Sequence, residues 1–468
     1  MKKTIVLAGL FAAASLHAAV IEQVIVRQQW PWSTDVKVEY KLADVTSAVD
    51  ISVKAFNGGT ELPLPADAVT GDLYGITESG IGQFVIDPVK AFGNQKVAIA
   101  DFRVELELSA SPADINEVIY KVFCLTNNND CVDITRKDIL NGKYGSYETD
   151  FAKLGDGFKT PLADVLIWTG VTNNIDYKTT HLVMRKMPAG GVVWKSGDDA
   201  GAIAHRLTRA PEYYVELTQD FFIGVFELTQ DQYTRIYGSN PSSFQGEDDS
   251  PYRPVENVYR YLIHGNPNPA YAKGVITSEV IAWPTNSYLH DVGSNTVLDK
   301  LRTLTGVEFD MPMSAQWEFA CRAGSTNALY SGKVQTEGNV NELSWNEKNS
   351  GDTTHVVGCK APNAYGLYDI LGNVSEFVHD QGVPYEGGTG SGLSEQDPMV
   401  DPLGEDNTEA SYNKISNRVE RGGSYISTDG YWRDHRAGAA CNFYAWAASQ
   451  PFIGVRLVCP VGAQWSAH

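Results

Sequence analysis

The chain has 468 residues, of which 43% are hydrophobic and 20% are charged, a composition that excludes bulk disorder. With 37 Lys and Arg against 57 Asp and Glu, the formal net charge is -20 at pH 7, which would repel a polyanion and argues against a nucleic-acid partner. The length exceeds what one hydrophobic core supports, so two or three domains are expected.

The first 19 residues have the pattern of a secretory signal peptide. Two lysines follow Met1, an apolar run covers residues 4–16, and the small residues Ala18 and Ala19 suit a signal peptidase. A membrane anchor is the alternative, but a span needs about 20 apolar residues and this run is shorter. We therefore expect residues 1–19 to be removed and the mature protein to be secreted or periplasmic, with no membrane span.

Residues 20–109 alternate apolar and polar side chains in short runs, such as VKVEY at 36–40 and FRVELEL at 102–108. A period of two, bounded by Gly, Pro, Asn and Asp, is typical of half-buried antiparallel strands. Several such runs in series predict an all-β sandwich module. Residues 110–179 are polar and rich in turns, and we interpret them as a connector.

The cysteines are even in number, which favours disulfides in an exported chain; they are Cys124, Cys131, Cys321, Cys359, Cys441 and Cys459. Cys124 and Cys131 bracket the turn-rich residues 125–130, so a short disulfide staple is expected there. A metal site is the weaker alternative, because no second pair of Cys or His stands nearby at ligand spacing.

Residues 180–460 differ in their sequence pattern, which predicts helices among many short strands and long loops. An apolar strand at 221–228 leads into a helix that Thr229 and Gln232 open as a capping box and Gly238 ends. A second helix begins near Ser314 and ends at Gly324, with Trp317, Ala320 and Cys321 on one face. The pattern predicts an α+β domain.

Nine motifs follow one another over residues 181–459, namely 188–190, 222–230, 238–242, 254–258, 316–324, 362–370, 372–377, 418–425 and 453–457. In this order they resemble the sulfatase-modifying factor, or formylglycine-generating enzyme, family. The resemblance implies a C-type-lectin-like fold held by calcium and disulfides. Active members of that family use copper and dioxygen to convert a sulfatase cysteine to formylglycine. Other branches are non-haem iron sulfoxide synthases, or binding proteins with a diversified C-terminal surface.

The chemistry of the oxidase requires two thiolates for copper, one shortly after a Gly-Gly-Ser-Tyr turn and one five residues later. Here that turn is RGGSY at 421–425, and the two matching positions hold Ser427 and Trp432, so copper and formylglycine formation are not expected. Cys441 is the nearest thiol downstream and would supply a single sulfur for a displaced oxidase site, which is the alternative function. The His-x3-His-x-Glu pattern of the sulfoxide synthases is absent from the sequence.

The loop between residues 424 and 451 is dense in aromatic side chains, Arg and Asn, which are enriched at recognition surfaces. Its pocket candidates are Ser424, Ser427, Tyr431, Trp432 and His435. The alternative is a loop packed against its own domain. We interpret lone histidines, such as His379 and His435, as hydrogen-bonded loop residues. The sequence therefore favours a secreted ligand-binding or scaffold module for an unknown protein or glycan.

The resemblance also implies a disulfide between Cys321 and Cys459, although Cys459 lies two residues beyond the usual place; Cys359 and Cys441 are left without an assigned partner. It further implies a structural calcium ion at Asp369, Gly372, Val374 and Glu376. Two carboxylates with backbone carbonyls between them suit the hard oxygen ligands of calcium. The alternative is that the two carboxylates cap a turn and stay solvated.

Overall fold

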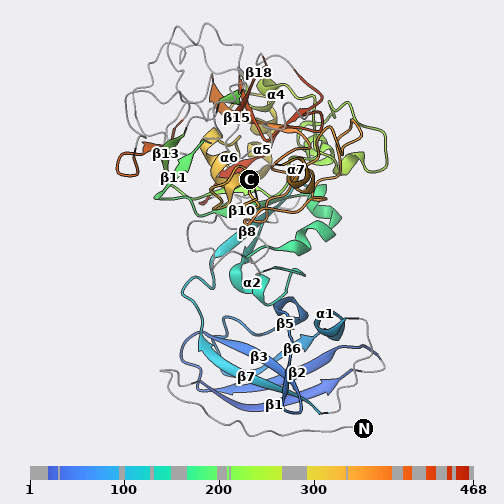
Figure 1. Cartoon of the computed structure of the whole chain (residues 1–468), viewed down its shortest axis with the longest axis vertical. Helices are drawn as coiled ribbons and strands as arrows, with labels where there is room; N and C mark the ends of the chain where they lie inside the picture. Colours follow the sequence, from blue (N-terminus) through green and yellow to red (C-terminus); the bar gives the residue numbers. More distant parts are fainter. Residues whose placement is uncertain are drawn as a thin grey trace. The chain divides into compact units, whose positions relative to one another are not determined.

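The computed structural model describes residues 19–29, 32–93, 101–126, 131–148, 166–197, 208–209, 212–265, 292–333, 336–381, 394–402, 418–427, 440–444 and 449–462 (Figure 1). The chain forms two compact units. The first consists of Met1–Ile119, Ile134–Thr149 and Leu166–Val171, and the second of Tyr120–Asp133, Asp150–Val165 and Thr172–His468. Among the helices described, none has the length and apolar character needed to cross a membrane.

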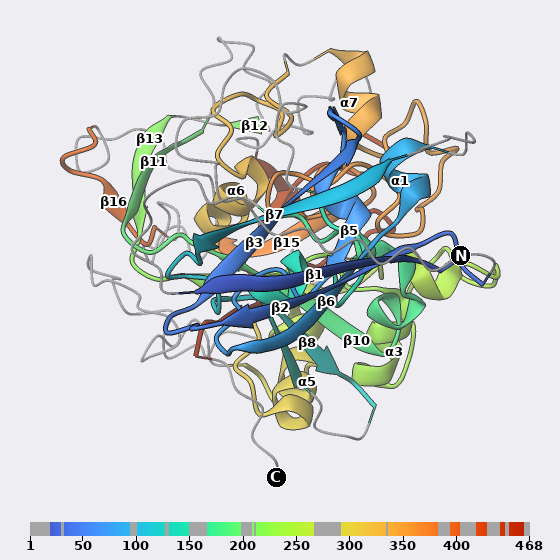
Figure 2. The ribbon, with the colours of Figure 1, turned by 90° about the horizontal axis from the view of Figure 1, so that it is seen from below.

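Two antiparallel sheets build the first unit (Figure 2). One has the order β1 (Val20–Gln28), β2 (Val36–Ala43), β6 (Gly80–Ile86), β5 (Val69–Gly71), and the other β4 (Thr60–Leu62), β3 (Val49–Asn57), β7 (Phe102–Ala110). The predicted strands at 36–40 and 102–108 are thus present. Two short helices accompany the sheets, α1 (Pro88–Phe92) and α2 (Arg136–Leu140).

The core of the first unit follows from the alternation along its strands. On β2, Val38, Tyr40 and Leu42 are buried while the residues between them are more exposed. They pack in one cluster with Ile51 of β3 and Phe84 of β6. Side chains from both sheets therefore share one apolar core, as a period of two requires.

The segment expected to be a connector, 110–179, is divided between the two units. Its strands β8 (Val118–Cys124) and β9 (Cys131–Thr135) stand at one edge of a five-stranded sheet with the order β20-β14-β10-β8-β9. The other strands of this sheet are β10 (His181–Met187), β14 (Phe221–Gly224) and β20 (Val458–Pro460). Apolar side chains along β8 explain this placement, because from Ile119 to Cys124 the strand is buried throughout.

The second unit contains two further sheets. A three-stranded sheet has the order β11 (Val192–Ser196), β13 (Tyr213–Leu217), β16 (Met399–Val400). A five-stranded sheet has the order β12 (Thr208–Arg209), β18 (Ala440–Tyr444), β17 (Arg418–Arg421), β15 (Ser375–Gln381), β19 (Ile453–Gly454). The helices are α3 (Gln230–Tyr237), α4 (Arg260–Ile263), α5 (Val297–Thr305), α6 (Ser314–Arg322) and α7 (Glu337–Leu343). Helices and mixed sheets together give an α+β unit.

Both helices predicted for this unit are present. Thr229 and Gln232 form the expected capping box of α3, which ends at Gly238 with a left-handed φ of 94°. All nine residues of α6 are buried, including Trp317 at 0% exposure, so this helix lies in the core rather than on a surface. It ends at Arg322; Ala323 is the left-handed C-cap, and Gly324 follows with a φ of 85°.

Neither predicted disulfide is present in the structure, because Cys124, Cys131, Cys321 and Cys459 are all free thiols. Cys321 on α6 has Arg322, Glu318 and Glu376 as its charged neighbours. Cys459 on β20 instead has Lys121 and Cys131 as its electrostatic neighbours. The two thiols therefore have different charged neighbours, and the structure does not confirm the implied pairing. Cys359 is also free and exposed, whereas the side chain of Cys441 lies outside the described residues.

Candidate functional site

The turn that leads into β15 carries the residues predicted to bind calcium. Asp369 and Asn373 have left-handed φ values of 51° and 57°, and Gly372 has φ 87°. A Cβ on Gly372 would come within 2.5 Å of the Trp345 carbonyl oxygen, so only glycine fits at this position. Asn373 N–H donates to that same carbonyl at 2.9 Å. The sequence LGN at 371–373 thus enforces a tight turn against its neighbour.

Main-chain hydrogen bonds join this turn to the RGGSY turn at 421–425. Gly372 N–H donates to the Gly422 carbonyl at 2.9 Å, and Tyr425 N–H donates to the Asn373 carbonyl at 2.9 Å. Gly422 has φ 92°, and a Cβ there would lie 2.9 Å from the Ile370 carbonyl oxygen. Two motifs that are about fifty residues apart in sequence therefore form one structural element.

Three buried carboxylates surround a single buried guanidinium at this element. Asp369, Glu376 and Glu227 are 1%, 1% and 0% exposed, and Arg456 is 0% exposed. Arg456 Nη2 contacts Glu376 Oε1 at 2.7 Å, and its Nη1 donates to the carbonyls of Gly224 and Val225 at 2.9 and 3.0 Å. We call Glu227, Asp369, Glu376 and Arg456 the carboxylate cluster.

Each acid of the carboxylate cluster has a raised pKa, and burial is the main cause. Burial raises the pKa of Asp369 to about 6, with Glu376 adding repulsion, while Gly358 N–H and Arg456 oppose the shift. Burial raises the pKa of Glu227 well above its ordinary value, and repulsion from Asp369 and Glu376 adds to it. Burial also raises the pKa of Glu376, against the attraction of Arg456. Ionisation of these acids is therefore harder in the folded protein than in water, and a bound cation would favour their charged forms.

The carboxylate oxygens of the carboxylate cluster differ in whether they have hydrogen-bond partners. Glu376 Oε2 accepts Trp317 Nε1–H at 2.6 Å and both of its oxygens accept Arg456 Nε–H, so its hydrogen-bonding capacity is used. Asp369 Oδ2 accepts Gly358 N–H at 2.5 Å, but its Oδ1 is buried without a partner. Asp369 thus fits a cation ligand as it stands, whereas Glu376 would have to give up a hydrogen bond.

Sequence reasoning missed Glu227 and Arg456 as members of this site. Glu227 accepts hydrogen bonds from Asn373 Nδ2 and Val374 N–H at 2.8 and 3.1 Å. Glu227 is the single charged residue of FIGVFELTQ at 222–230, and Arg456 is the single charged residue of FIGVRL at 452–457. An isolated charge in a buried segment requires a partner in the core, and that signal was available in the sequence.

The pocket candidates after the RGGSY turn are described only in part. Ser424 is buried, and its N–H donates to Ser427 Oγ at 3.0 Å while Ser427 N–H returns a bond to the Ser424 carbonyl at 3.0 Å. Ser427 therefore closes a turn with its own hydroxyl. Tyr431, Trp432 and His435 lie outside the described residues.

Comparison with known proteins agrees with these motifs. The family model described as sulfatase-modifying factor enzyme 1-like domain matches residues 180–461, which is more than half of the chain. The chain is 32% identical over 186 residues to the chaperone protein LppX of Paenibacillus barcinonensis, covering 34% of this chain and 61% of that protein. It is 30% identical over 139 residues to the formylglycine-generating enzyme of Bos taurus, covering 28% of this chain and 33% of that enzyme.

Among solved structures, Treponema denticola variable protein 1 is similar with a TM-score of 0.42 and 24% identity, over 60% of this chain and 95% of that one. The chain spans less than two thirds of the length of both curated relatives named above. From residue 180 onward, where the nine motifs and the carboxylate cluster lie, the chain belongs to the family of sulfatase-modifying factor enzyme 1-like domains.

Proposed function

We propose that this protein is an exported ligand-binding or scaffold module, built on a sulfatase-modifying factor domain that does not form formylglycine. The observation that carries the proposal is the state of Ser427. It stands where the resemblance places the first copper thiolate, and its hydroxyl is engaged by Ser424 N–H at 3.0 Å. A hydroxyl that closes its own turn offers copper(I) no soft ligand.

The described cysteines give further support, because a metal-binding or redox cysteine must be a thiolate. Burial raises the pKa of Cys321 and of Cys459, and both thiols are 0% exposed. Burial also raises the pKa of Cys131 to about 11. Burial therefore disfavours the thiolate form that a copper ligand needs at each of these three cysteines.

The recognition surface in this proposal is the loop that follows Ser427. Tyr425 at its base is 4% exposed and packs edge-on against Phe244 with ring centroids 5.2 Å apart, so its ring belongs to the core. Ile426 next to it is 38% exposed. Side chains therefore begin to face solvent where the aromatic-rich segment starts, as a binding loop on a rigid base requires.

Activity on a sulfatase-type peptide tests the first half of the proposal. The purified mature protein is loaded with copper(I) and incubated in air with a peptide that contains Cys-x-Pro-x-Arg. The mass of the peptide product is then measured by mass spectrometry. We expect the cysteine to remain unchanged. Conversion to formylglycine that Cys441→Ser abolishes would instead establish an oxidase with a displaced site.

Binding tests the second half, with an array of glycans and extracellular proteins as the probe. We expect the protein to bind a subset of the array and Trp432→Ala to weaken that binding at least about tenfold, the loss of one aromatic anchor. Trp32→Ala is the matched control, since Trp32 is 91% exposed in the first unit. Binding that survives Trp432→Ala together with Tyr431→Ala, or no binding at all, would contradict a recognition loop.

A further inference from the structure

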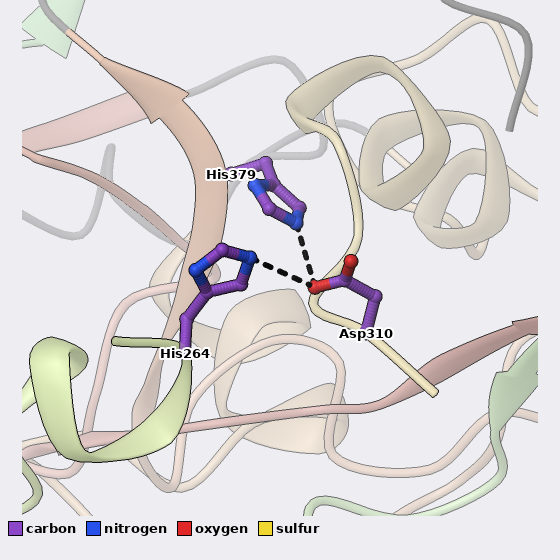
Figure 3. A group of neighbouring side chains, drawn as sticks. All are labelled: His264, Asp310 and His379. Carbon is purple, nitrogen blue, oxygen red and sulfur yellow. Dashed lines mark hydrogen bonds and ion pairs between the residues drawn. The ribbon is translucent and has the colours of Figure 1, made fainter. Parts of the chain in front are cut away.

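A second buried cluster shares no residue with the carboxylate cluster. Among the described residues, one group of His, Cys, Asp or Glu side chains brings three ligand atoms within 4.8 Å of one another: His264, Asp310 and His379. We call it the His-Asp-His cluster. The three side chains are 5%, 0% and 2% exposed. Figure 3 shows both imidazole rings turned toward the same Asp310 oxygen.

Main-chain hydrogen bonds from separate elements hold the three residues in place. His264 follows α4, where its N–H donates to the Arg260 carbonyl at 3.0 Å. Asp310 exchanges two hydrogen bonds with Val458 of β20, at 2.9 and 2.8 Å. His379 lies on β15 and donates its N–H to the Pro312 carbonyl at 2.9 Å. The positions are therefore set by the fold, which is what a preorganised site requires.

One nitrogen of this cluster has no partner. His379 Nε2 and Asp310 Oδ1 are 2.6 Å apart and share a hydrogen bond, but His264 Nε2 is 3.8 Å from the same oxygen. His264 Nε2 is buried and makes no hydrogen bond. In the tautomer that carries its proton on Nδ1, this nitrogen offers a lone pair to a ligand. An unsatisfied buried nitrogen costs stability unless it has a ligand.

We propose that His264, Asp310 and His379 bind a divalent transition-metal ion, of the Zn²⁺ or Fe²⁺ type. Two imidazoles and one carboxylate are the donor set that such ions prefer, and calcium, which takes oxygen ligands, is disfavoured here. Ligand atoms around a tetrahedral ion with bonds of about 2.1 Å stand about 3.4 Å apart. The observed separations of 2.6 and 3.8 Å bracket that value, so small side-chain movements admit the ion.

The surroundings of Asp310 suit binding through a single oxygen. Arg302 Nη2 contacts the other oxygen, Oδ2, at 3.2 Å, and Met311 N–H donates to Oδ1 at 2.7 Å. Outer contacts of this kind orient a ligating carboxylate. Arg302 also pairs with Glu308 at 2.7 Å, which offsets its charge near the metal. The ion replaces the hydrogen bond between His379 and Asp310 and gives His264 Nε2 its missing partner.

Metal binding to the full mature chain tests this site. The protein is stripped with a chelator, its metal content is checked by mass spectrometry, and Zn²⁺ is titrated against a fluorescent chelator with excess Ca²⁺ present. We expect one tight Zn²⁺ per chain, and His264→Gln to weaken it at least about 100-fold. His355→Gln is the matched control, since His355 stacks on Trp345 outside the cluster and should leave the affinity unchanged.

Cobalt substitution separates this site from binding by cysteines. Co²⁺ held by two imidazoles and a carboxylate gives visible absorption without a thiolate charge-transfer band, and this spectrum should vanish in His264→Gln. If circular dichroism shows that variant to be unfolded, His379→Gln provides the same comparison. Equal Zn²⁺ affinity in wild type and variant, a thiolate band, or no tight Zn²⁺ in the wild type would each overturn the proposal.

Discussion

The two units of this protein bury different kinds of side chain. Among the described residues of the first unit, the buried side chains include no charged, amide or Ser/Thr group. Its ion pairs lie on the surface, such as Lys54 with Glu107, whose side chains are 41% and 61% exposed. The second unit buries Glu227, Glu318 and Arg456 at 0% exposure.

This difference means that the stability of the two units depends on different properties of their cores. An apolar core tolerates many rearrangements of similar volume, so the first unit depends on area buried from water. A buried charge is stable only when its partners are placed correctly, so the second unit depends on geometry. We therefore expect substitutions of charged residues to have small effects in the first unit and large effects in the second.

Removal of the central cation should have the largest effect. Arg456→Met leaves Glu376 and its neighbours without their guanidinium, and breaking a buried ion pair costs about 3–5 kcal/mol. Denaturant unfolding followed by tryptophan fluorescence measures the loss. Lys54→Met in the first unit is the control and should leave the free energy of unfolding nearly unchanged, because exposed ion pairs contribute little. Similar costs in both variants would remove the contrast between the units.

Calcium provides a second test of the difference between the units, since it would stabilise the second unit alone. We expect calcium at 100 times its Kd to stabilise the wild type by about 2.7 kcal/mol, measured as a chelator-reversible rise in the melting temperature. Asp369→Ala should abolish this rise, because Asp369 Oδ1 is the unsatisfied ligand. Glu376→Ala separates the alternatives. A rise that persists in that variant excludes Glu376 as a ligand, and one that persists in both excludes the site.

Substitution of glycine should change the free energy of unfolding by an intermediate amount. Gly422→Ala would place a methyl group 2.9 Å from the Ile370 carbonyl oxygen at φ 92°, and we expect a loss of about 1–3 kcal/mol. Gly59→Ala in the first unit is the matched control, because nothing lies within 4 Å of its added Cβ and its φ is not in the left-handed region. Urea midpoints of the two variants measure the difference. Equal midpoints would mean that the RGGSY turn adapts.

The smallest expected effect is a pH dependence at Glu256, which is 0% exposed and has an unpartnered Oε2. Burial raises the pKa of Glu256 from 4.5 to about 7, so the folded state retains a proton that the unfolded state releases. Stability should therefore fall as pH rises from 4.5 to 7. Glu256→Gln stays neutral and keeps the acceptor for Phe244 N–H, so it should be more stable than the wild type at pH 8 and equally stable at pH 4.

Thermal melts at the two pH values check this prediction. Glu107→Gln is the control, since its side chain is 61% exposed in the first unit and should show no such difference. A gain for Glu256→Gln that is equal at both pH values would point to packing rather than ionisation.

Local patterns in the sequence predicted the local structure. The period of two found β2 and β7, and the capping box at Thr229 found α3, because each signal depends on neighbours in the chain. The same local signals mark α5, which Thr296 caps and Gly306 ends, although the sequence analysis did not predict it. The family motifs led to Asp369 and Glu376, but not to the engagement of Glu376 by Arg456 from 80 residues away.

The His-Asp-His cluster could not be predicted in this way. His264, Asp310 and His379 follow no ligand spacing, since 46 and 69 residues separate consecutive members by number. His379 was interpreted as a loop residue and lies on β15 instead. The hydrogen bond from His379 to Pro312 brings β15 to the segment that carries Asp310, and Arg260 of α4, four residues before His264, donates to the His379 carbonyl at 3.1 Å. Contacts of this range are set by topology, which sequence periodicity does not contain.

The hydrogen bonds between the turns at 369–376 and 421–425 have a consequence for how this protein evolves. Gly372 to Gly422 and Tyr425 to Asn373 are bonds between main chains, so they depend on no side chain after residue 427. Side-chain changes in the segment that follows therefore leave these bonds intact. Natural variants should accumulate more changes between Ser427 and β18 than at Gly372 or Gly422, and a library randomised over 428–439 should express as well as the parent.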